Sequence, residues 1–590
     1  MSSDPRPQTD IDRIAERWVD TLIRHQPTVG TYIGRTEVDG SLPDLSPAGA
    51  EAFADAQRAS LGELERAEAA DDVDRVTQAD LSAELRLALA RHDAGEALRD
   101  LNVIASPPQD LRDAFDLMPR ETEEHWARIA QRMRGLPGAL EGYREALAEG
   151  ARRGLAPAIR QVREVAAQAR RVAGGGSGGA AGHDGGHGGE AGFFAELAAL
   201  ASEAGASSSA LSESTPEPLS EPLRAELADA ARGASRAYDG LAEFLDGDLA
   251  PSAAQADAFG RDRYELASEM FLGARVDLDE TYEWGLDELR RMVDEQQRVA
   301  VEIVGGRPRP GIVAEAVAQL EADPRRKLHG TDALRQWMQQ VSDRAVEELA
   351  GAQFDIPAEI RALECMIAPT QEGGIYYTGP SDDFSRPGRM WWSVPEGVTE
   401  FDTWRELTTV YHEGVPGHHL QIGTAVVNRG SLNEWRRQLA GTSGHAEGWA
   451  LYAERLMERL GYLDDPADRL GMLDGQRMRA ARVVLDIGVH LGKRRPDGGV
   501  WDGEYALEFM RENVNMNDGF VRFEVNRYLG WAGQAPSYKV GQRIWEQLRD
   551  EAAERAGASG ATFDIRDFHR EALSLGGVRL DTLQRALRRA

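Results

Sequence analysis

Apolar residues recur every three or four positions through most of residues 9–353. This is the period of an α-helix that buries one face. Short breaks at glycine and proline divide the pattern into separate helices. The repeat is clearest near the start of the chain, where it runs through Ile11, Ile14, Trp18, Leu22 and Ile23. The pattern therefore predicts a mainly α protein.

A different pattern follows this helical part of the chain. Residues 361–367 and 389–394 are short runs with strand character, and they flank glycine- and tyrosine-rich turns. Such runs predict a small antiparallel β-sheet, next to a helix that should begin near Thr403. The stretch around Trp391 and Trp392 could offer backbone groups to an extended peptide. Alternatively, both tryptophans could simply belong to the core.

Composition divides the chain into four regions. One glycine-rich stretch cannot bury a core and should form a flexible insertion, although metal binding by its His183 and His187 is an alternative. The predicted regions are an N-terminal helical region (1–172), the insertion (173–192), a second helical region (193–355) and a C-terminal region with the motifs described next (356–590). We expect two helical lobes around a deep cleft, with the sheet next to the helix that begins near Thr403.

Histidine and glutamate cluster in the eight residues 412–419, which read HEGVPGHH. Catalytic zinc takes three protein ligands, commonly two His and one Glu, and leaves a fourth position for water. The metal lowers the pKa of that water, and a nearby carboxylate takes its proton. In the motif H-E-x-x-H, a helix supplies two His one turn apart with the Glu between them. His412 and Glu413 match the start of this motif, so Glu413 is the candidate general base and zinc the candidate cofactor.

The next histidine departs from that motif, because His418 follows His412 by six residues rather than four. On a regular helix, six residues rotate the side chain by about 600° and move it about 9 Å along the axis. Pro416 and Gly417 lie between the two, and a kink there could bring His418 back towards His412. His419 is the competing ligand. We favour His418 and expect His419 to support the ligands from outside.

A second acidic motif, at residues 445–454, supplies the third candidate ligand. Glu447 and Glu454 are seven residues apart and therefore share a helix face. Their small and aromatic neighbours suit the segment to close packing, so we predict Glu447 as the third ligand. Glu454 would then orient a ligand histidine through its free N–H. The alternative is an acidic face exposed to solvent.

The motifs H-E-x-x-P-G-H-H-x-Q at 412–421 and E-G-W-A-x-Y-x-E at 447–454 together resemble the bacterial family known as domain of unknown function 885 (DUF885). That family is regarded as gluzincin-like. The Glu-x6-Glu spacing is also similar to the thimet oligopeptidase and carboxypeptidase Taq families, in which the first Glu is the third zinc ligand and H-E-x-x-H is uninterrupted. The resemblance implies zinc-dependent hydrolysis of peptide or peptide-like amide bonds.

A polar stripe on a later helix adds further candidates. Arg482, Asp486 and His490 follow one another at intervals of four residues among apolar neighbours. They resemble the Arg…Asp-x-Gly-x-His pattern of the family, and an Asp beside a His fixes its tautomer. Asp486 is therefore a candidate support for the ligands and His490 a candidate substrate contact. A buried salt bridge is the alternative.

Residues 533–541 are similar to a Gly-Tyr-x-x-x-Tyr-x-x-Gly segment of the carboxypeptidase Taq relatives. A zinc peptidase needs a donor aimed at the developing oxyanion, and the hydroxyl of Tyr538 is our candidate. The alternative is a tyrosine packed at the start of a helix. Arg527 and Gln534 are candidate substrate contacts, as is Tyr377 between the two predicted strands.

Composition excludes some classes of partner, and the resemblance implies a peptide or small amide substrate. The net charge of −31 at pH 7 argues against nucleic acids and anionic membranes, because both attract positive surfaces. The single cysteine, Cys365, excludes an internal disulfide and a cysteine-rich zinc site. The N-terminus lacks the apolar segment of a secretory signal, and no apolar run is long enough to span a membrane, so we expect a cytoplasmic protein.

Two alternatives to a peptidase remain open from the sequence. One is a metal-dependent amidohydrolase that acts on a non-peptide small molecule, since a metal centre does not fix the substrate. The other is a non-catalytic zinc-binding protein in which the altered histidine spacing marks lost function. Glu413 argues against the second alternative, because a structural zinc site needs no general base. The sequence predicts neither the length of the substrate nor the oligomeric state.

Overall fold

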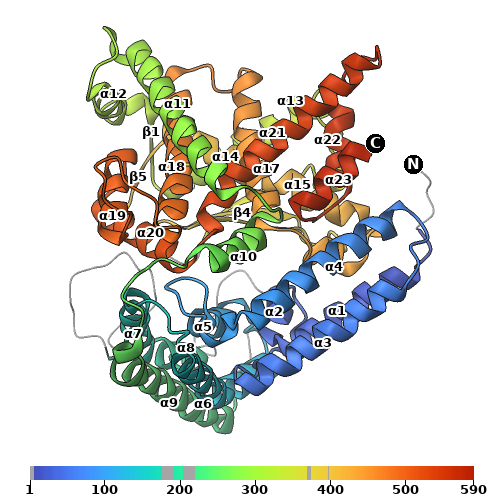
Figure 1. The fold of residues 1–590 in the computed structure, drawn as a ribbon, viewed down its shortest axis with the longest axis vertical. Coiled ribbons are helices and arrows are strands. Elements are labelled where there is room, and N and C mark those ends of the chain that lie inside the picture. Colours follow the sequence, from blue (N-terminus) through green and yellow to red (C-terminus); the bar gives the residue numbers. More distant parts are fainter. Residues whose placement is uncertain (1–5, 176–191, 204–218, 369–373, 396, 590) are drawn as a thin grey trace.

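The fold is given by a computed structural model that describes residues 6–175, 192–203, 219–368, 374–395 and 397–589. Helices dominate it, and they form two groups (Figure 1). The first nine helices lie in the lower part of the molecule and the remaining helices lie above them, together with the strands. The mainly α fold expected from the sequence is thus confirmed. Most of the predicted glycine-rich insertion lies outside the described residues.

The lower group begins with a capped amphipathic helix. At its start, the backbone N–H of Asp12 donates to the Thr9 hydroxyl, and the carboxylate of Asp12 accepts from the N–H of Thr9. This reciprocal pair satisfies two donors that a helix N-terminus leaves free. The helices of this group are α1 (Asp10–His25), α2 (Pro27–Tyr32), α3 (Pro47–Arg66), α4 (Asp72–Asp93), α5 (Pro107–Leu117), α6 (Glu123–Arg152), α7 (Ile159–Ala173), α8 (Phe193–Glu203) and α9 (Glu221–Phe244).

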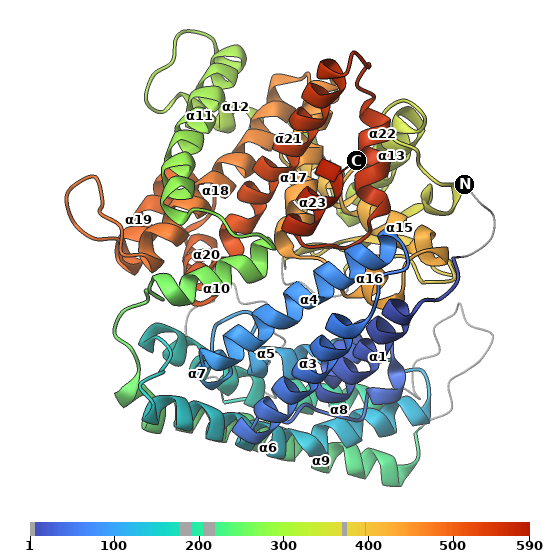
Figure 2. The ribbon, with the colours of Figure 1, turned by 45° about the vertical axis from the view of Figure 1, so that its right-hand side comes forward.

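The upper group contains the two long helices α11 and α18, which pack along one another, and the pair α17 and α21, which lie side by side in Figures 1 and 2. Its helices are α10 (Arg261–Leu272), α11 (Leu278–Val304), α12 (Ile312–Glu321), α13 (Thr331–Leu349), α14 (Thr403–Glu413), α15 (His418–Val427), α16 (Glu434–Gln438), α17 (Ser443–Arg459), α18 (Pro466–His490), α19 (Gly503–Asn513), α20 (Asp518–Gly530), α21 (Gln534–Ala558), α22 (Ile565–Ser574) and α23 (Leu580–Arg589).

The strands of two small sheets lie between α12 and α14 in the chain. β1 (Lys327–His329) pairs antiparallel with β5 (Glu400–Asp402). The second sheet has the order β2-β4-β3, from β2 (Leu363–Ile367), β3 (Ile375–Thr378) and β4 (Gly388–Trp392). A small sheet with an antiparallel pair is present, as expected from the sequence, but the two predicted strands are β2 and β4, and these pair in parallel. The antiparallel partner of β4 is β3, which lies in the stretch expected to form turns. α14 follows β5 directly and contacts β3.

The position of β4 decides between the two roles considered for its tryptophans. β4 is paired on both sides, by β2 and by β3, so its backbone groups are already used within the sheet. Trp392 is buried in the core beneath the sheet, and the indole N–H of Trp391 donates to the hydroxyl of Thr378. An extended peptide therefore cannot pair with β4. The only edge of this sheet that adjoins the cavity described next, among the described residues, is β3.

A cavity of about 750 Å³ lies between the two groups of helices, where the sequence analysis expects a cleft. Residues of α5, α7 and α9 line it from below, and residues of α14, α17, α18, α20 and α21 line it from above. The cavity therefore brings together parts of the chain that are more than 300 residues apart, such as Gln109 and Tyr538. It is large enough for a small peptide.

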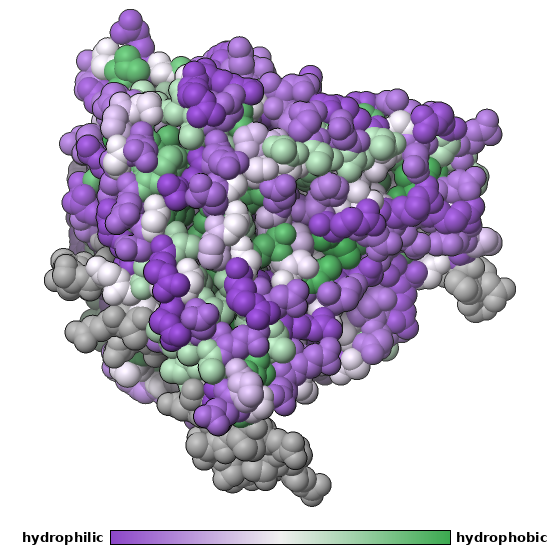
Figure 3. All heavy atoms as spheres, turned by 90° about the horizontal axis from the view of Figure 1, so that it is seen from below, coloured by the Kyte–Doolittle hydropathy of each residue, from purple (hydrophilic) through white to green (hydrophobic). Residues whose placement is uncertain are grey.

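The hydrophobic core does not follow the four predicted regions. One cluster of buried side chains runs from Leu101 to Ala253 and joins helices on both sides of the predicted insertion. A larger one runs from Tyr264 to Leu587 and crosses the predicted boundary at residue 355. Seen from below, the face of the lower group is mostly hydrophilic, with small apolar areas between (Figure 3). In the part of the chain that the structure describes, no helix combines the length and apolar character needed to cross a membrane.

Candidate metal centre

A break between two helices brings His412 and His418 together. α14 ends at Glu413, and α15 begins at His418, so the four residues between them are not helical. The chain turns back sharply there, because the N–H of Gly417 donates to the carbonyl oxygen of Tyr411 at 3.0 Å. The rings of His412 and His418 lie 4.9 Å apart between centroids. The break at Pro416 and Gly417 therefore brings His418 back beside His412, which a regular helix could not do for residues six positions apart.

Close packing of α17 against α21 places the second motif. A Cβ atom on Gly448 would lie 2.5 Å from the backbone of Gly541, and one on Gly541 would lie 2.2 Å from the carbonyl oxygen of Gly444. Only glycine allows the two backbones to approach this closely. Trp449 is fully buried on the same helix, and its indole N–H donates to the carbonyl oxygen of Pro416. These contacts fix α17, and with it Glu447, against the break between α14 and α15.

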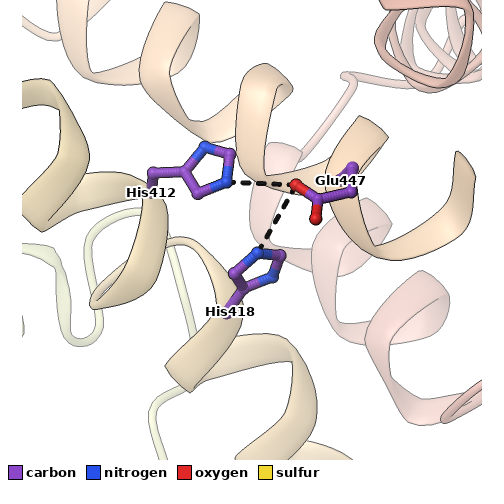
Figure 4. Close-up of side chains that lie close together, drawn as sticks. All are labelled: His412, His418 and Glu447. Atoms are coloured by element: carbon purple, nitrogen blue, oxygen red, sulfur yellow. Dashed lines mark hydrogen bonds and ion pairs between the residues drawn. The ribbon is translucent and has the colours of Figure 1, made fainter. Parts of the chain in front are cut away.

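His412, His418 and Glu447 form one cluster (Figure 4). One ligand atom from each of the three lies within 4.8 Å of the others. The Nε2 atom of His412 lies 3.2 Å from Oε2 of Glu447, and Nε2 of His418 lies 3.7 Å from the same oxygen. Figure 4 shows both rings pointing at this carboxylate. Two imidazole nitrogens and one carboxylate oxygen thus converge on a single point.

The residues around the cluster favour positive charge at that point. Burial alone would lower the pKa of His412, but hydrogen bonds to Glu447 and Glu454 raise it to about 10. Burial would raise the pKa of Glu447, whereas His412 and His418 hold it well below its usual range. Two carboxylates that face one imidazole stabilise a cation there, whether a proton or a metal ion carries the charge.

Glu454 holds His412 from the side opposite to the cluster. The Nδ1–H of His412 donates to Oε1 of Glu454 at 2.8 Å, which leaves Nε2 free to face Glu447. Such a carboxylate fixes the tautomer and the ring orientation of a metal-binding histidine. Glu454 is itself held, because the side-chain amide of Gln476 donates to its Oε2 at 3.2 Å. The ammonium of Lys539 in turn donates to the amide oxygen of Gln476.

The donor set fits a metal ion. The cluster offers three ligand atoms from buried or partly buried side chains, and His412 is oriented by a carboxylate. Nδ1 of His418 is buried and has no hydrogen-bond partner in the described part of the chain, so its ring is not held there by a competing contact. Two His and one Glu are a donor set of catalytic zinc sites, which keep a further position open.

Glu413 lies on the wall of the cavity next to the cluster. Its side chain is buried, and burial raises the pKa of its carboxyl group, whereas the imidazoles of His418 and His412 oppose the rise. Its carboxylate oxygens are not among the three atoms that converge in the cluster. The carboxylate is therefore near the cluster and open to the cavity, as a group that exchanges protons with a bound molecule must be.

His419 lies elsewhere, although it adjoins His418 in the chain. The hydroxyl of Tyr377 lies 2.9 Å from its Nδ1, and its Nε2–H donates to the carbonyl oxygen of Ile360 at 2.8 Å. Burial lowers the pKa of His419 to about 4, so the ring is neutral. Both nitrogens of His419 are thus used in holding α15 against β3 and the short helical turn that ends at Ile360. Tyr377 is used in the same contact and does not line the cavity, so the structure does not place it as a substrate contact.

The structure does not bring Asp486 or His490 to the site, contrary to the roles predicted for them. The carboxylate of Asp486 accepts from the Tyr264 hydroxyl at 2.6 Å and from the Gly533 N–H at 2.9 Å. Nε2–H of His490 donates to the carbonyl oxygen of Tyr528 at 3.1 Å. Each step of four residues moves the stripe about 6 Å along α18. Only its first member therefore reaches the cavity, and the other two lie in the packed interior.

Tyr538, the predicted oxyanion donor, and Arg527, a predicted substrate contact, both line the cavity opposite the lower helices. Their roles stay predictions. Burial and the negative charge of Glu447 raise the pKa of Tyr538, which keeps its hydroxyl protonated and able to donate. Arg527 donates to Oε1 of Gln534 at 2.6 Å and to Oε1 of Glu524 at 3.1 Å. Gln534 thus positions Arg527 rather than lining the cavity itself.

Three residues near the cluster have no role in the sequence analysis: Gln476, Arg479 and Lys539. Gln476 and Arg479 belong to α18, and they lie upstream of the polar stripe that starts at Arg482. Residues 477–482 include three arginines, a pattern typical of a helix face exposed to solvent. Gln476 and Arg479 therefore do not stand out in the sequence. Lys539 follows Tyr538 directly and is buried. The chain has only three lysines, and this rarity is the sequence signal that could have drawn attention to Lys539.

Replacing Gly417 with alanine is expected to disperse the cluster. A Cβ atom at this position would lie 1.9 Å from the carbonyl oxygen of His412, and backbone atoms cannot move aside as a flexible side chain can. We expect bound metal to be lost and stability to fall by about 1–3 kcal/mol, as overpacking does. Metal content and thermal unfolding measure the two effects. Gly240→Ala is the control, because a Cβ there meets nothing within 4 Å; equal metal content in both variants would contradict the prediction.

The fold and the site together define a mainly helical protein with a His–His–Glu cluster, suited to a metal ion, at a cavity between two groups of helices. The chain belongs to the family described as "Bacterial protein of unknown function (DUF885)", whose model matches residues 27–587. The resemblance found in the two motifs is confirmed to that extent. A comparison with curated proteins finds no match.

Two solved structures share this fold. One, from Colwellia psychrerythraea, is 20% identical, covers 99% of each chain and has a TM-score of 0.80. The other, from Shewanella oneidensis, is 17% identical, covers 98% of this chain and 99% of its own, and has a TM-score of 0.72. Each is described as a "putative lipoprotein". A carboxypeptidase from Pyrococcus furiosus is 12% identical over 99% of each chain, but its TM-score of 0.34 is too low to support any argument.

These two structures contradict the cytoplasmic location expected from the sequence. Lipoproteins are anchored to a membrane by a lipid, so the descriptions of both proteins place that class of protein at a membrane. The expectation rests on the hydrophilic character of the first residues, which tests for one kind of targeting segment only.

Proposed function

We propose that this protein is a zinc-dependent hydrolase that cleaves peptide or peptide-like amide bonds. The observation that carries the proposal is the convergence of His412, His418 and Glu447 on one point, with Glu413 beside them on the cavity wall. A zinc site that only stabilises a fold is usually closed by four protein ligands. This cluster has three ligands and opens into a cavity of about 750 Å³.

His412, His418 and Glu447 would hold the zinc ion, with Glu454 orienting His412. When bound, zinc acts as a Lewis acid that polarises a carbonyl group and lowers the pKa of water. Every other part of the chemistry belongs to side chains of this chain. Glu413 accepts a proton from the attacking water and passes it to the leaving amine, for which its raised pKa is suited.

Tyr538 supplies the remaining charge stabilisation. Its hydroxyl is held in the protonated form beside the cluster, so it can donate to the oxygen on which negative charge develops when water attacks an amide carbonyl. The guanidinium groups of Arg479 and Arg482 lie 5.7 and 5.3 Å from the centre of its ring and restrict its position. Tyr538 thus faces the reacting bond from the wall formed by α18 and α21.

The shape and lining of the cavity suit a short peptide. Gly374 and Ile375, at the start of the edge strand β3, reach the cavity wall, so an extended chain could pair with that edge. Apolar side chains, among them Phe520 and Phe523 of α20, line another part of the wall and can receive an apolar residue. These features favour peptides and N-acyl amino acids over a small compact amide.

The proposal is tested by hydrolysis assays on a panel of dipeptides, short oligopeptides and N-acyl amino acids. We expect zinc-loaded protein to hydrolyse peptides, a chelator to abolish the activity, and added zinc to restore it. Activity that survives complete removal of the metal would contradict a metal-dependent mechanism. Activity on N-acyl amino acids alone would assign the protein to the non-peptide amidohydrolases, and no hydrolysis of any amide would leave a metal-binding protein without this activity.

A further inference from the structure

One arginine in the cavity has no partner within the described part of the protein. Arg479 of α18 lines the cavity close to the cluster, and it takes part in none of the hydrogen bonds or ion pairs of the described residues. Its Nε atom is buried without an acceptor. A buried N–H that lacks an acceptor is costly, unless a ligand supplies one. The side chain as a whole is partly buried, so the rest of its guanidinium group is open to the cavity.

The neighbours of Arg479 leave room for its guanidinium group in this place. Its Nη1 atom lies 2.6 Å from the position that a Cβ atom would take on Gly475, one turn earlier in α18. Any larger residue at position 475 would displace it. On its other side, the guanidinium group lies 5.7 Å from the ring of Tyr538. Arg479 therefore occupies a defined position between the helix backbone and the proposed oxyanion donor.

The other arginines on the upper wall of the cavity already have partners. Arg405 pairs with Glu321 and Asp474. Arg482 and Arg527 share a single carboxylate, because both pair with Glu524.

The wall near Tyr538 thus carries three arginines, Arg479, Arg482 and Arg527, beside two carboxylates, Glu524 and the candidate ligand Glu447. Of the three arginines, only Arg479 lacks a carboxylate partner among the described residues. A guanidinium group on a cavity wall that has no carboxylate partner attracts an anionic group of a ligand.

Arg479 also lies close to the reacting groups. Burial raises the pKa of Glu413, and Arg479 is among the charges that oppose the rise. Burial likewise acts on Glu454, and Arg479 is the largest opposing influence there. The guanidinium group is thus close enough to act on the carboxylates around the cluster. An anion bound to it would lie near the bond that is cleaved.

We propose that Arg479 binds the α-carboxylate at the C-terminus of the substrate, so that the enzyme removes residues from the carboxyl end of peptides or N-acyl amino acids. A guanidinium group binds a carboxylate through two parallel hydrogen bonds, which fixes both the position and the orientation of the chain end. This inference rests on the proposed hydrolytic function and names its substrate class. An amidated peptide has no charge to offer, so it would leave Arg479 unpaired.

The inference is tested with two probes, N-acetyl-Ala-Ala-Phe and the same peptide with a C-terminal amide. We expect zinc-loaded protein to cleave the free acid with a kcat/KM at least about 100-fold higher than the amide, because a site built to bind a group rejects the analogue that lacks it. In Arg479→Gln this ratio should fall to about one, through loss of activity on the acid alone. Gly475→Ala, which displaces the guanidinium group, should lower the ratio in the same direction.

Arg469→Gln is the matched control, because Arg469 belongs to the same helix but pairs with Glu302 at the surface. It should leave the ratio unchanged. If wild type cleaves both probes equally, the inference is wrong and the proposed hydrolase function still stands. If Arg479→Gln loses activity on both probes by the same factor, Arg479 only balances the charge of the cluster, and the inference is again wrong.

A binding measurement separates this inference from the proposed function. Calorimetric titration of zinc-loaded Glu413→Gln, which should not turn over, is expected to show tighter binding of the acid than of the amide by at least about tenfold. The difference should disappear in the double variant with Arg479→Gln. Selective binding without hydrolysis by wild type would support the role of Arg479 and contradict the hydrolase. The absence of both hydrolysis and selective binding would overturn the inference.

Discussion

Replacing Glu413 with glutamine is expected to lower the rate of hydrolysis by about two to four orders of magnitude, the usual contribution of a general base. The side chain keeps its size but loses the ability to accept a proton. Bound metal should remain at the wild-type level, because Glu413 is not among the three residues whose ligand atoms converge. The measurements are kcat on the best substrate of the panel and zinc content by mass spectrometry.

Glu406→Gln provides the matched control for this variant. Glu406 lies two turns earlier on α14 and lines the same cavity, and burial raises the pKa of its carboxyl group to about 7. None of its described contacts is with the cluster. We therefore expect its kcat to stay within a few-fold of wild type. Full activity of Glu413→Gln would show that another group accepts the proton, and loss of zinc from it would show that Glu413 is needed to hold the metal.

The helical part of the fold could be predicted from the sequence because its signals are local. The apolar repeat through Ile11, Ile14 and Trp18 places those side chains in the core, as the period of the helix requires. The order of the strands could not be predicted in the same way. The parallel pairing of β2 with β4 joins segments that are separated by β3 in the chain, and no local pattern encodes it. That pairing is what removes β4 from contact with a substrate.

The candidate site shows the same division between local and long-range information. The requirement for a break between His412 and His418 follows from helix geometry, and residues 414–417 provide it. The roles expected of Asp486 and His490 fail, because a stripe along a helix gives the direction of a side chain but not how far along the helix the cavity extends. Arg479 could not be found for a related reason, since only the tertiary structure shows that it has no hydrogen-bond or ion-pair partner among the described residues.

The second large effect is expected at His418. Alanine at this position should reduce bound zinc from about one ion per chain to almost none, because it removes one of three ligands. His419→Ala should retain the metal, since both ring nitrogens of His419 are used by Tyr377 and Ile360. The two variants remove the same chemical group from neighbouring positions of one buried helix, so they control for each other. Zinc content by mass spectrometry, after dialysis against metal-free buffer, is the measurement.

Apart from the contribution of bound zinc, His419→Ala should lose more stability than His418→Ala. His419→Ala leaves a partly buried hydroxyl and a buried carbonyl without their partner, which should cost about 1–3 kcal/mol of stability. His418→Ala leaves no such group, because Nδ1 of His418 has no partner among the described residues and its Nε2 faces Glu447. We therefore expect the variant that loses zinc to unfold near the temperature of the metal-free wild type, and the variant that keeps zinc to unfold below the zinc-bound wild type. Loss of zinc from His419→Ala with retention in His418→Ala would show that His419 is the ligand and His418 is not. The reason for placing the reaction at the cavity wall beside Glu413 and Glu447 would then be lost.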